Sequence, residues 1–314
     1  MAIPDSLKAG LRLPVVVAPM FLISDPALVV AACRSGVIGS FPSLNARTSA
    51  DYEAWLEVIA RDLRPGDAPF AVNLIVARQN TRLAQDLAIT VKYRVPLVIT
   101  SFGADREVVA AVHAYGGLVF HDIASVRHAE IAASAGVDGM IVLTTGAGGH
   151  TGALNPFALL NEVRGIYDGA LLLAGALSTG RDVAAALMAG ADFAYMGTRF
   201  IATAEAGVEP AYRDMMVAGG AADVVVTRGL TGTPASFLKS SLSLASLDPV
   251  DMARRTTIMD DAERDRTGRP WKDIWSAGQG IGSIRDAPPV DVLVRRLETE
   301  YDAAVAGFAQ ASIR

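Results

Sequence analysis

The sequence predicts a single (β/α)8 barrel of the TIM type that carries a small, mostly helical insertion after its eighth strand. Short apolar runs of strand length alternate with Ala-rich amphipathic stretches from Pro14 to Phe200. Links that contain glycine join these runs, as is typical of parallel βαβ units. The strand-like runs number eight, which is what a closed barrel needs. A doubly wound sheet usually carries a Gly-rich turn after its first strand, whereas here that run ends in Ala18-Pro19-Met20.

The strands are expected where β-branched and other apolar residues form short runs, and the helices are expected between them. Ser125 stands directly before one helix, and Asn155 precedes Pro156 at the start of another. Serine and asparagine are preferred N-cap residues, and proline fits the first helical turn. The expected strands are residues 14–20, 37–43, 70–76, 97–103, 118–124, 139–145, 170–176 and 193–200, and the main expected helices are residues 51–61, 105–114, 126–135, 155–163 and 180–189.

The alternation of strands and helices ends after the eighth run. Residues 260–266 form a charged helical stretch. Residues 290–308 have apolar side chains at helical spacing, so this last helix is expected to return to the barrel. We therefore expect the barrel to consist of residues 1–204 and 276–314, and residues 205–275 to form a helical lid over the barrel mouth.

Composition and charge exclude several classes of protein. Hydrophobic residues make up 51% of the 314 residues, but no apolar run reaches the roughly 18 to 20 residues of a membrane-spanning helix. The net charge of −5 gives no basic footprint for nucleic acid. Residues 1–13 lack a signal-peptide pattern, and the lone Cys33 excludes an internal disulfide and a CxxC metal site. We expect a cytoplasmic protein with a buried Cys33, and the oligomeric state stays open, with a homodimer among the options.

The candidate catalytic residue lies in a glycine-rich segment after the sixth strand. In a barrel of this type, catalytic groups lie where the strands end at the C-terminal face. Residues 144–152 read Thr-Thr-Gly-Ala-Gly-Gly-His-Thr-Gly. Glycine lets backbone amides approach a ligand closely, so we expect His150 to face whatever binds at the mouth. The alternative is a flexible turn with an incidental surface histidine.

A phosphate site is expected after the seventh and eighth strands, where barrels of this type commonly bind phosphate through backbone amides. Gly175 and Ala176 follow the seventh run, and Gly197 and Thr198 lie in the eighth. Thr198 adds a hydroxyl donor. Each pair alone is common at a βα turn, but the two pairs stand in the required places and in the required order.

The remaining polar residues of the strands and helices are less specific. Asn73 in the third run needs a hydrogen-bond partner, which is either a neighbouring backbone group or a ligand. His121 in the fifth run is either a core histidine or a ligand contact. His113 and His128 fall on helices and are expected in solvent, away from the mouth. No pair of histidine and carboxylate has metal-ligand spacing, so no catalytic metal is expected.

On these residues the chain resembles the nitronate monooxygenase family, formerly called 2-nitropropane dioxygenases, over nearly its whole length. The run 18–20 is similar to the first-strand motif of the family, and Asn73 matches its third-strand asparagine. Residues 147–152 resemble the AGGHxG signature, in which the histidine is the proposed base or substrate contact. Residues 275–280 resemble a late segment that folds back near the flavin.

The resemblance implies an FMN enzyme with His150 as its catalytic residue. It implies oxidation of an alkyl nitronate with O2 to a carbonyl compound and nitrite, and thus a small-molecule substrate without a nucleic-acid or membrane partner. The flavin carries the electron chemistry in such an enzyme, and the protein positions it. The expected FMN contacts are Ala18, Pro19, Met20, Asn73, His121, Gly148, Gly149, Gly175, Ala176, Gly197, Thr198 and Gln279.

The sequence departs from the family at positions that bear on the ligands. Ala176 replaces the second glycine after the seventh strand, which still leaves a backbone amide for phosphate. Ser101 stands where many nitronate oxidisers carry a histidine, and Thr144-Thr145 replace a common Gln-Gly. The superfamily also contains flavin-dependent quinone and enoyl-thioester reductases, and residues 121–129 resemble a run in one such quinone reductase. The alternatives are therefore reduction of a quinone or enoyl thioester by NAD(P)H, and a non-catalytic phosphate binder.

Overall fold

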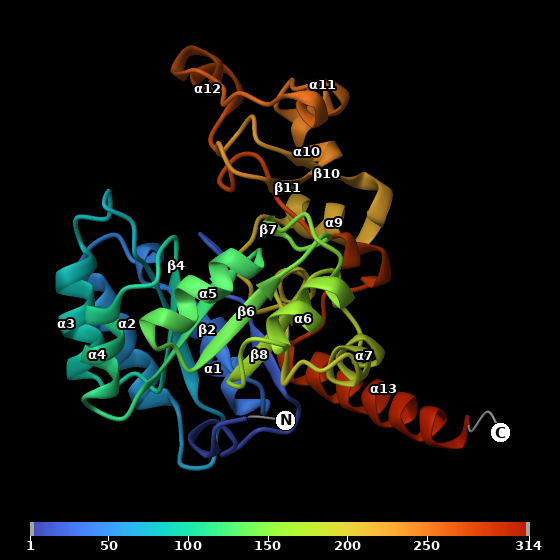
Figure 1. The fold of residues 1–314 in the computed structure, drawn as a ribbon. Helices are drawn as coiled ribbons and strands as arrows, with labels where there is room; N and C mark the ends of the chain where they lie inside the picture. The colour runs from blue at the N-terminus through green and yellow to red at the C-terminus, as the bar shows by residue number, and fades with distance from the viewer. Residues whose placement is uncertain (1–2, 312–314) are drawn as a thin grey trace.

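The computed structural model describes residues 3–311, so residues 1–2 and 312–314 of the predicted barrel segments lie outside the described residues. Parallel strands form an eight-stranded sheet in the order β1-β9-β8-β6-β5-β4-β3-β2. A parallel bridge between Val16 and Ile38 joins β1 to β2 and closes the barrel (Figure 1). The predicted barrel is confirmed. The strands are β1 (Val15–Val17), β2 (Gly39–Pro42), β3 (Phe70–Ile75), β4 (Leu97–Ser101), β5 (Leu118–Ile123), β6 (Gly139–Leu143), β8 (Ala170–Ala174) and β9 (Phe193–Met196).

Two apolar layers lie on the two faces of the barrel sheet. One fills the lumen with side chains such as Ile99, Phe120 and Tyr195, and the other lies between the strands and the helices. Successive side chains of a strand point to opposite faces. Asp122 therefore faces the same side as Phe120, and Ser101 the same side as Ile99. These polar residues lie at the C-terminal ends of the strands, directly above the apolar lumen.

The helices around the barrel begin where the sequence provides capping groups. Ser125 accepts a hydrogen bond from the amide of His128, and Asn155 accepts one from the amide of Phe157. The two predicted caps are confirmed, and Cys33 is buried as expected. The outer helices are α1 (Pro26–Arg34), α2 (Ser49–Asp62), α3 (Leu83–Lys92), α4 (Arg106–His113), α5 (Val126–Ala135), α6 (Pro156–Arg164) and α7 (Gly180–Met188).

The eighth strand is shorter than the run 193–200 predicted for it. It ends at Met196, and the residues that follow form the short helix α8 (Thr198–Ile201). Gly197 has helical backbone angles, and its carbonyl accepts from the amides of Phe200 at 2.8 Å and Ile201 at 3.2 Å. The apolar run was interpreted as one strand because apolarity alone does not show where the chain turns into a helix.

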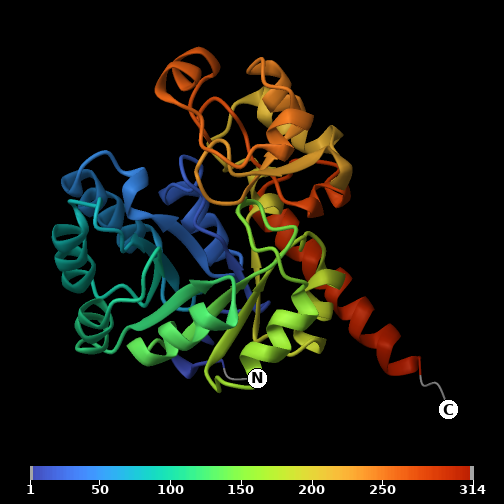
Figure 2. The same ribbon diagram turned by 45° about the horizontal axis from the view of Figure 1, so that its top comes forward.

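The segment after β9 stands over the C-terminal ends of the barrel strands (Figures 1 and 2). It is mostly helical, with α9 (Pro210–Ala218), α10 (Lys239–Leu244), α11 (Pro249–Arg254) and α12 (Asp261–Thr267). It also contains β10 (Val224–Thr227) and β11 (Ala235–Leu238), which pair antiparallel. β11 pairs in turn with β7 (Gly149–His150), the segment of the candidate histidine. We propose residues 205–275 as a lid with the boundaries expected above.

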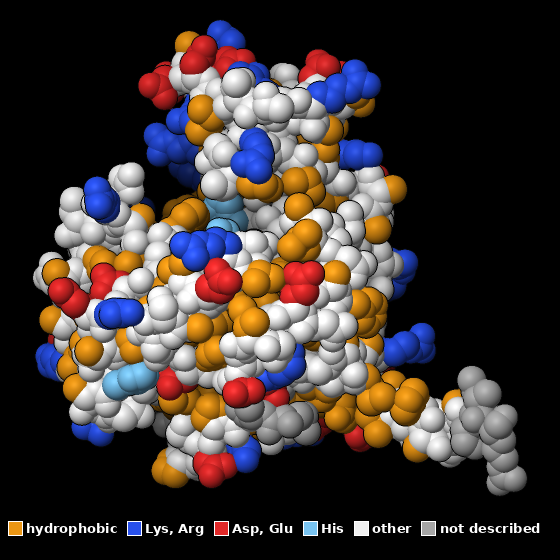
Figure 3. Space-filling model, in the orientation of Figure 1, with side chains coloured by type: hydrophobic (Ala, Val, Ile, Leu, Met, Phe, Trp, Pro, Cys, Tyr) orange, Lys and Arg blue, Asp and Glu red, His pale blue; other side chains and the backbone are white. Residues whose placement is uncertain are grey.

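Charged and apolar side chains are mixed on the face of the molecule that Figure 3 shows. Within residues 3–311, no helix is both long and apolar enough to cross a membrane. The longest helix described, α13 (Val290–Gln310), carries several charged side chains.

A close backbone contact fixes α13 against the barrel. It packs on α7, where the amide of Gly180 donates to the Oε2 of Glu300 at 2.8 Å. A Cβ placed on Gly180 would lie 1.9 Å from the carbonyl oxygen of Leu297. Because the obstructing atom belongs to the backbone of a helix, no side-chain rotation relieves this contact.

We expect Gly180→Ala to lower the free energy of unfolding by about 1 to 3 kcal/mol or more, because the added methyl group pushes α13 away from α7. The matched control is Gly307→Ala in α13, where nothing lies within 4 Å of the added Cβ. That control should be neutral or stabilising by up to about 1 kcal/mol. Chemical denaturation measures both, and equal stability of the two variants would contradict the packing argument.

Candidate active site

A cavity of about 690 Å³ opens at the C-terminal ends of the barrel strands. Twelve of the thirteen site residues predicted from the sequence line it, and Gln279 does not. Gln279 is exposed, and its amide donates to the carbonyl of Gly146 at 2.9 Å. The predicted residues at the cavity wall are Ala18, Pro19, Met20, Asn73, His121, Gly148, Gly149, His150, Gly175, Ala176, Gly197 and Thr198.

His150 is held in place by backbone pairing and by aromatic contacts. It lies on β7 opposite Ala235 of β11. Its ring centroid is 5.2 Å from that of Phe102 and 5.2 Å from that of Trp271, and both contacts are edge-on. Burial lowers the pKa of His150 below its ordinary value. At neutral pH the imidazole is therefore uncharged, with a ring nitrogen free to accept a proton.

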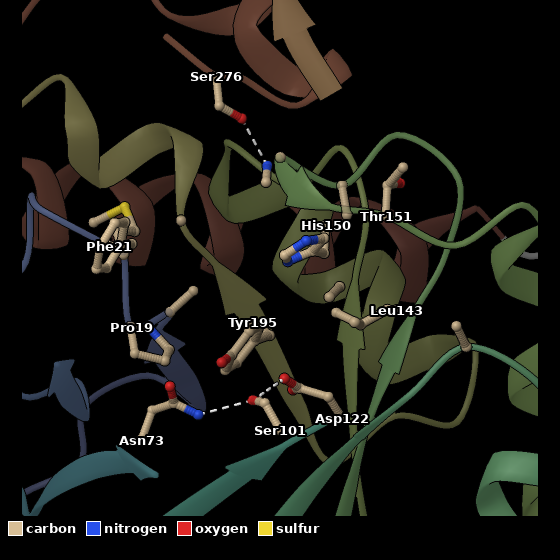
Figure 4. A pocket seen from close by; sticks show the side chains of 18 of the residues that line it. Pro19, Phe21, Asn73, Ser101, Asp122, Leu143, His150, Thr151, Tyr195 and Ser276 are labelled. Atoms are coloured by element: carbon tan, nitrogen blue, oxygen red, sulfur yellow. Dashed lines mark hydrogen bonds between the residues drawn. The ribbon is translucent and has the colours of Figure 1, made fainter. Parts of the chain in front are cut away.

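The neighbouring residue of β7 is tied to the late segment of the chain. The amide of Gly149 donates to the Oγ of Ser276 at 2.8 Å, and this Oγ donates to the carbonyl of Ser236 at 2.6 Å (Figure 4). The predicted late segment 275–280 thus reaches the cavity, since Ser276 and Gly280 line it. These contacts show that the histidine does not lie in a free turn.

A polar chain of side chains crosses the cavity floor. The Nδ2 of Asn73 donates to the Oγ of Ser101 at 2.8 Å, and this hydroxyl donates to the Oδ2 of Asp122 at 2.6 Å (Figure 4). Burial raises the pKa of Asp122 to about 6, although the Ser101 hydrogen bond lowers it. Tyr195 also lines the floor, and burial raises its pKa well above the ordinary value. The floor can therefore exchange a proton near neutral pH through Asp122.

The four histidines differ in what they contact. The Nδ1 of His121 lies 2.8 Å from the Oγ1 of Thr100, and burial lowers its pKa to about 4. His121 lies on the face of β5 opposite to Asp122. It still lines the cavity, and its Nδ1 is already hydrogen-bonded to Thr100. His128 was expected away from the mouth, which is wrong, because it is exposed but lines the cavity. His113 is an exposed helix residue that pairs with Asp138.

The loops after β6, β8 and β9 form a cradle that added side chains would fill. A Cβ on Gly148 would lie 2.8 Å from the Oγ1 of Thr198, and a Cβ on Gly175 would lie 2.2 Å from the Oγ1 of Thr144. The Oγ1 of Thr198 accepts from the amide of Gly278 at 2.9 Å, which leaves its own hydroxyl proton free to donate. The amides of Gly148 and Gly197 have no acceptor among the described residues. Such donors suit a phosphate.

The amide of Ala176 differs from the expectation. It was expected to be available for phosphate, but it donates to the carbonyl of Gly146 at 3.2 Å. Ala176 also has a φ of +55°, which is uncommon for a residue with a side chain. This closed turn holds the loops after β6 and β8 together, so Ala176 shapes the cradle without offering its amide.

Four residues of the site were missed by reasoning from the sequence. Asp122 and Tyr195 could have been found from strand alternation, because each lies two residues after a lumen-facing residue of its strand. Phe102 and Trp271 carry no sequence signal, because tertiary packing alone brings them to His150. Both have positive φ, at 64° and 63°, and such outliers gather at functional sites.

Within residues 3–311, no group of three or more histidine, cysteine or carboxylate side chains could hold a metal ion. The candidate cofactor pocket is therefore defined by amides, hydroxyls, aromatic rings and the two proton-exchanging groups, His150 and Asp122.

The chain is similar to several known proteins. A family model described as nitronate monooxygenase matches residues 78–300. A dehydrogenase of Rhodococcus jostii, (3aS,4S,5R,7aS)-5-hydroxy-7a-methyl-1-oxo-octahydro-1H-indene-4-carboxyl-CoA dehydrogenase, is 31% identical over 74% of this chain, and the match spans 64% of that protein. A nitronate monooxygenase of Paraburkholderia phytofirmans is 27% identical over 96% of this chain and 95% of its own length. A structure of nitroalkane oxidase from Streptomyces ansochromogenes has a TM-score of 0.79 and 25% identity, and covers 97% of this chain and 100% of that one.

We expect Ser276→Ala to loosen β7, because the half-buried Gly149 amide and the buried Ser236 carbonyl each lose a partner. The cost should be about 1 to 3 kcal/mol in the free energy of unfolding, with faster hydrogen exchange at the Gly149 amide. The control is Ser134→Ala, which removes an exposed hydroxyl bonded to the carbonyl of Ile131 within α5. Unchanged exchange at Gly149 would show that other contacts hold β7.

Proposed function

Because the chain belongs to the nitronate monooxygenase family, we propose that it is an FMN-dependent oxidoreductase that oxidises an alkyl nitronate with O2 to a carbonyl compound and nitrite. The observation that carries this proposal is the position of His150, with a ring nitrogen free and its pKa lowered, at the wall of the cavity. A neutral imidazole there can take the α-proton of a nitroalkane and then contact the nitronate it has formed.

The electrostatics of the cavity favour entry of a neutral substrate. None of the described residues that line it is a lysine or an arginine. A preformed nitronate would enter as an anion without a cationic partner, and burying an unpaired charge is costly. A neutral nitroalkane avoids this cost, and the anion then arises beside the imidazolium that His150 becomes. The proton that leaves the nitroalkane thus stays in the site, on His150.

The cradle at Thr198 and Gly148 supports FMN as the cofactor. Its free amides and hydroxyl donor fit one phosphate, and the apolar cavity below it can take the isoalloxazine ring. The flavin, when bound, supplies the capacity to accept electrons from the substrate. The chain itself holds the phosphate, orients the ring and excludes water.

The cytoplasmic location and the homodimer that were considered from the sequence remain predictions.

A second function has one observation in its favour. The cavity wall is largely apolar, with side chains such as Leu44, Ile131 and Leu143, and the similar Rhodococcus protein bears the name of a ring-carboxyl-CoA dehydrogenase. A flavin enzyme that exchanges electrons between NAD(P)H and a quinone or an enoyl thioester would also use such a wall. Anaerobic mixing decides between the two: propionate-3-nitronate or a nitroalkane should reduce the flavin faster than NADH or NADPH. Fast reduction by a nicotinamide alone would replace the first proposal with the second.

We expect Thr198→Glu to weaken FMN binding far more than Thr198→Val does. Both variants lose the acceptor for the Gly278 amide, but only the glutamate places a negative charge against the phosphate. Two like charges about 4 Å apart near a protein surface repel each other by up to about 4 kcal/mol, which corresponds to close to a thousandfold in affinity. Quenching of flavin fluorescence during titration of the apoprotein measures both constants. If the two variants weakened FMN binding equally, the phosphate would have to lie away from Thr198.

We expect His150→Gln to fold, to keep its flavin and to lose activity on a neutral nitroalkane by about 10²- to 10⁴-fold, as for a missing general base. Turnover of the preformed nitronate should fall less, because its proton is already gone. In the native protein kcat/KM on the nitroalkane should rise with pH as His150 loses its proton, and this rise should end at a lower pH than for an ordinary histidine, since burial lowers the pKa of His150. His113→Gln, which changes an exposed histidine, is the control. Equal losses on the two substrates would assign His150 to anion binding and not to proton transfer.

A further inference from the structure

The carboxyl group of Asp122 has one oxygen that no partner in the described chain satisfies. Its Oδ1 is shielded from solvent and makes no hydrogen bond. Asp122 lines the cavity, on the lumen face of β5. A buried polar atom without a partner is uncommon in a native structure and calls for an explanation. Because Asp122 lines the cavity, a molecule bound on the cavity floor is a candidate for the missing partner.

The hydrogen bonds on the floor run in one direction. Asn73 donates through Nδ2 to the Oγ of Ser101, so Ser101 directs its single proton to the Oδ2 of Asp122. Asn73 is also fixed by a second bond from Nδ2 to the carbonyl of Ile99 at 3.1 Å. Oδ2 therefore accepts, and Oδ1 is the oxygen that would carry the proton of the neutral acid.

The titratable groups on the elements around this carboxyl do not stabilise its ionised form. Tyr195 of β9 has a pKa raised well above its ordinary value, and His121 of β5 has a pKa lowered to about 4, so both are neutral between pH 5 and 8. His150 of β7 has a lowered pKa, and His128 of α5 is exposed to solvent. A ligand that covers the floor removes water and disfavours the carboxylate further.

We propose that Asp122, as the neutral acid, donates a hydrogen bond from Oδ1 to a carbonyl or nitro oxygen of the molecule bound on the cavity floor. This inference rests on the proposed function only in that a flavin or a nitro compound occupies the cavity. The flavin ring and the substrate both offer such an oxygen, and separate binding measurements distinguish them. Asp122 acts here as a positioning residue, with Ser101 and Asn73 holding its other oxygen.

The proposal fixes the sign of a pH dependence. Only the protonated carboxyl can donate, and in the empty site its pKa is about 6. Ligand affinity is then greatest and constant below about pH 6. Above that pH it falls by up to about tenfold per pH unit, because binding must first take up a proton. An ionised Asp122 that accepted a hydrogen bond from the ligand would give the opposite sign.

Two binding titrations between pH 5 and 8 test the proposal without turnover. The first follows riboflavin binding to the apoprotein by fluorescence quenching, because riboflavin lacks the phosphate of FMN, which itself titrates near pH 6. The second follows binding of 2-methyl-2-nitropropane to the FMN-loaded protein under anaerobic conditions by flavin absorbance, because this nitro compound has no α-proton and cannot enter the reaction. A fall in affinity above pH 6 in the first titration identifies a flavin oxygen, and a fall in the second alone identifies a substrate oxygen.

The variant Asp122→Asn replaces the neutral acid with an amide that can accept from Ser101 and donate to the ligand. It should keep the affinity that the native protein has at low pH and lose the pH dependence. Asp168→Asn, at an exposed carboxylate outside the cavity, should retain the dependence. Flat native titrations, affinity that rises with pH, or at least tenfold weaker binding by Asp122→Asn at pH 5 would each overturn the proposal.

Ser101→Ala provides a second test if the asparagine variant does not fold. The Ser101 hydrogen bond lowers the pKa of Asp122, so its removal should raise that pKa and move the onset of the affinity loss to higher pH. An unchanged onset would also overturn the proposal. Failure of the nitronate to reduce the flavin would refute the proposed function and leave these binding results unaffected.

Discussion

The alternation of side chains along the strands of a closed parallel barrel is the constraint on which the site depends. Once the bridge between Val16 and Ile38 closes the sheet, each strand has one face toward the lumen and one toward the helices. Neighbouring residues of β5 therefore have different roles. His121 lies on the helix side with Thr100 as its partner, while Asp122 reaches the floor of the mouth. The same parity places Asn73 and Ser101 on that floor, so three strands supply one polar chain.

The barrel alone would leave this floor open to water. The pairing of β7 with β11 and the tie from Gly149 to Ser276 bring the lid and the late segment against the mouth. The edge-on contacts of His150 with Phe102 and Trp271 join a barrel loop, the glycine-rich segment and the lid. The two rings cover part of the imidazole, which is half-buried. Its lowered pKa is thus a property of the assembled mouth and not of the loop that carries it.

The sequence predicted the barrel, its eight strand runs, two helix caps and most of the cavity wall, because these depend on local periodicity and on the position of strand ends. It did not predict β10 and β11, which have ordinary apolar character and become a sheet only through their pairing with β7. The engaged amide of Ala176 and the position of His128 depend on how loops close over the mouth. Asp122 follows His121 in the sequence. Because successive side chains of a strand point to opposite faces, the alternation along this strand would have placed Asp122, and not His121, on the lumen side.

The charge balance of the cavity connects these features to chemistry. Burial shifts its titratable groups toward their neutral forms: it depresses the pKa of His150 and raises that of Asp122 to about 6, and no lysine or arginine is among the described lining residues. A site of this kind cannot bind its substrate by ion pairing, so selectivity falls to shape and to hydrogen bonds whose protons are movable. The two proton-exchanging groups lie on different supports, one on a rigid barrel strand and one on the segment paired with the lid. A change in the lid would therefore act on the contacts of His150 directly, whereas the hydrogen bond to Asp122 comes from a barrel strand.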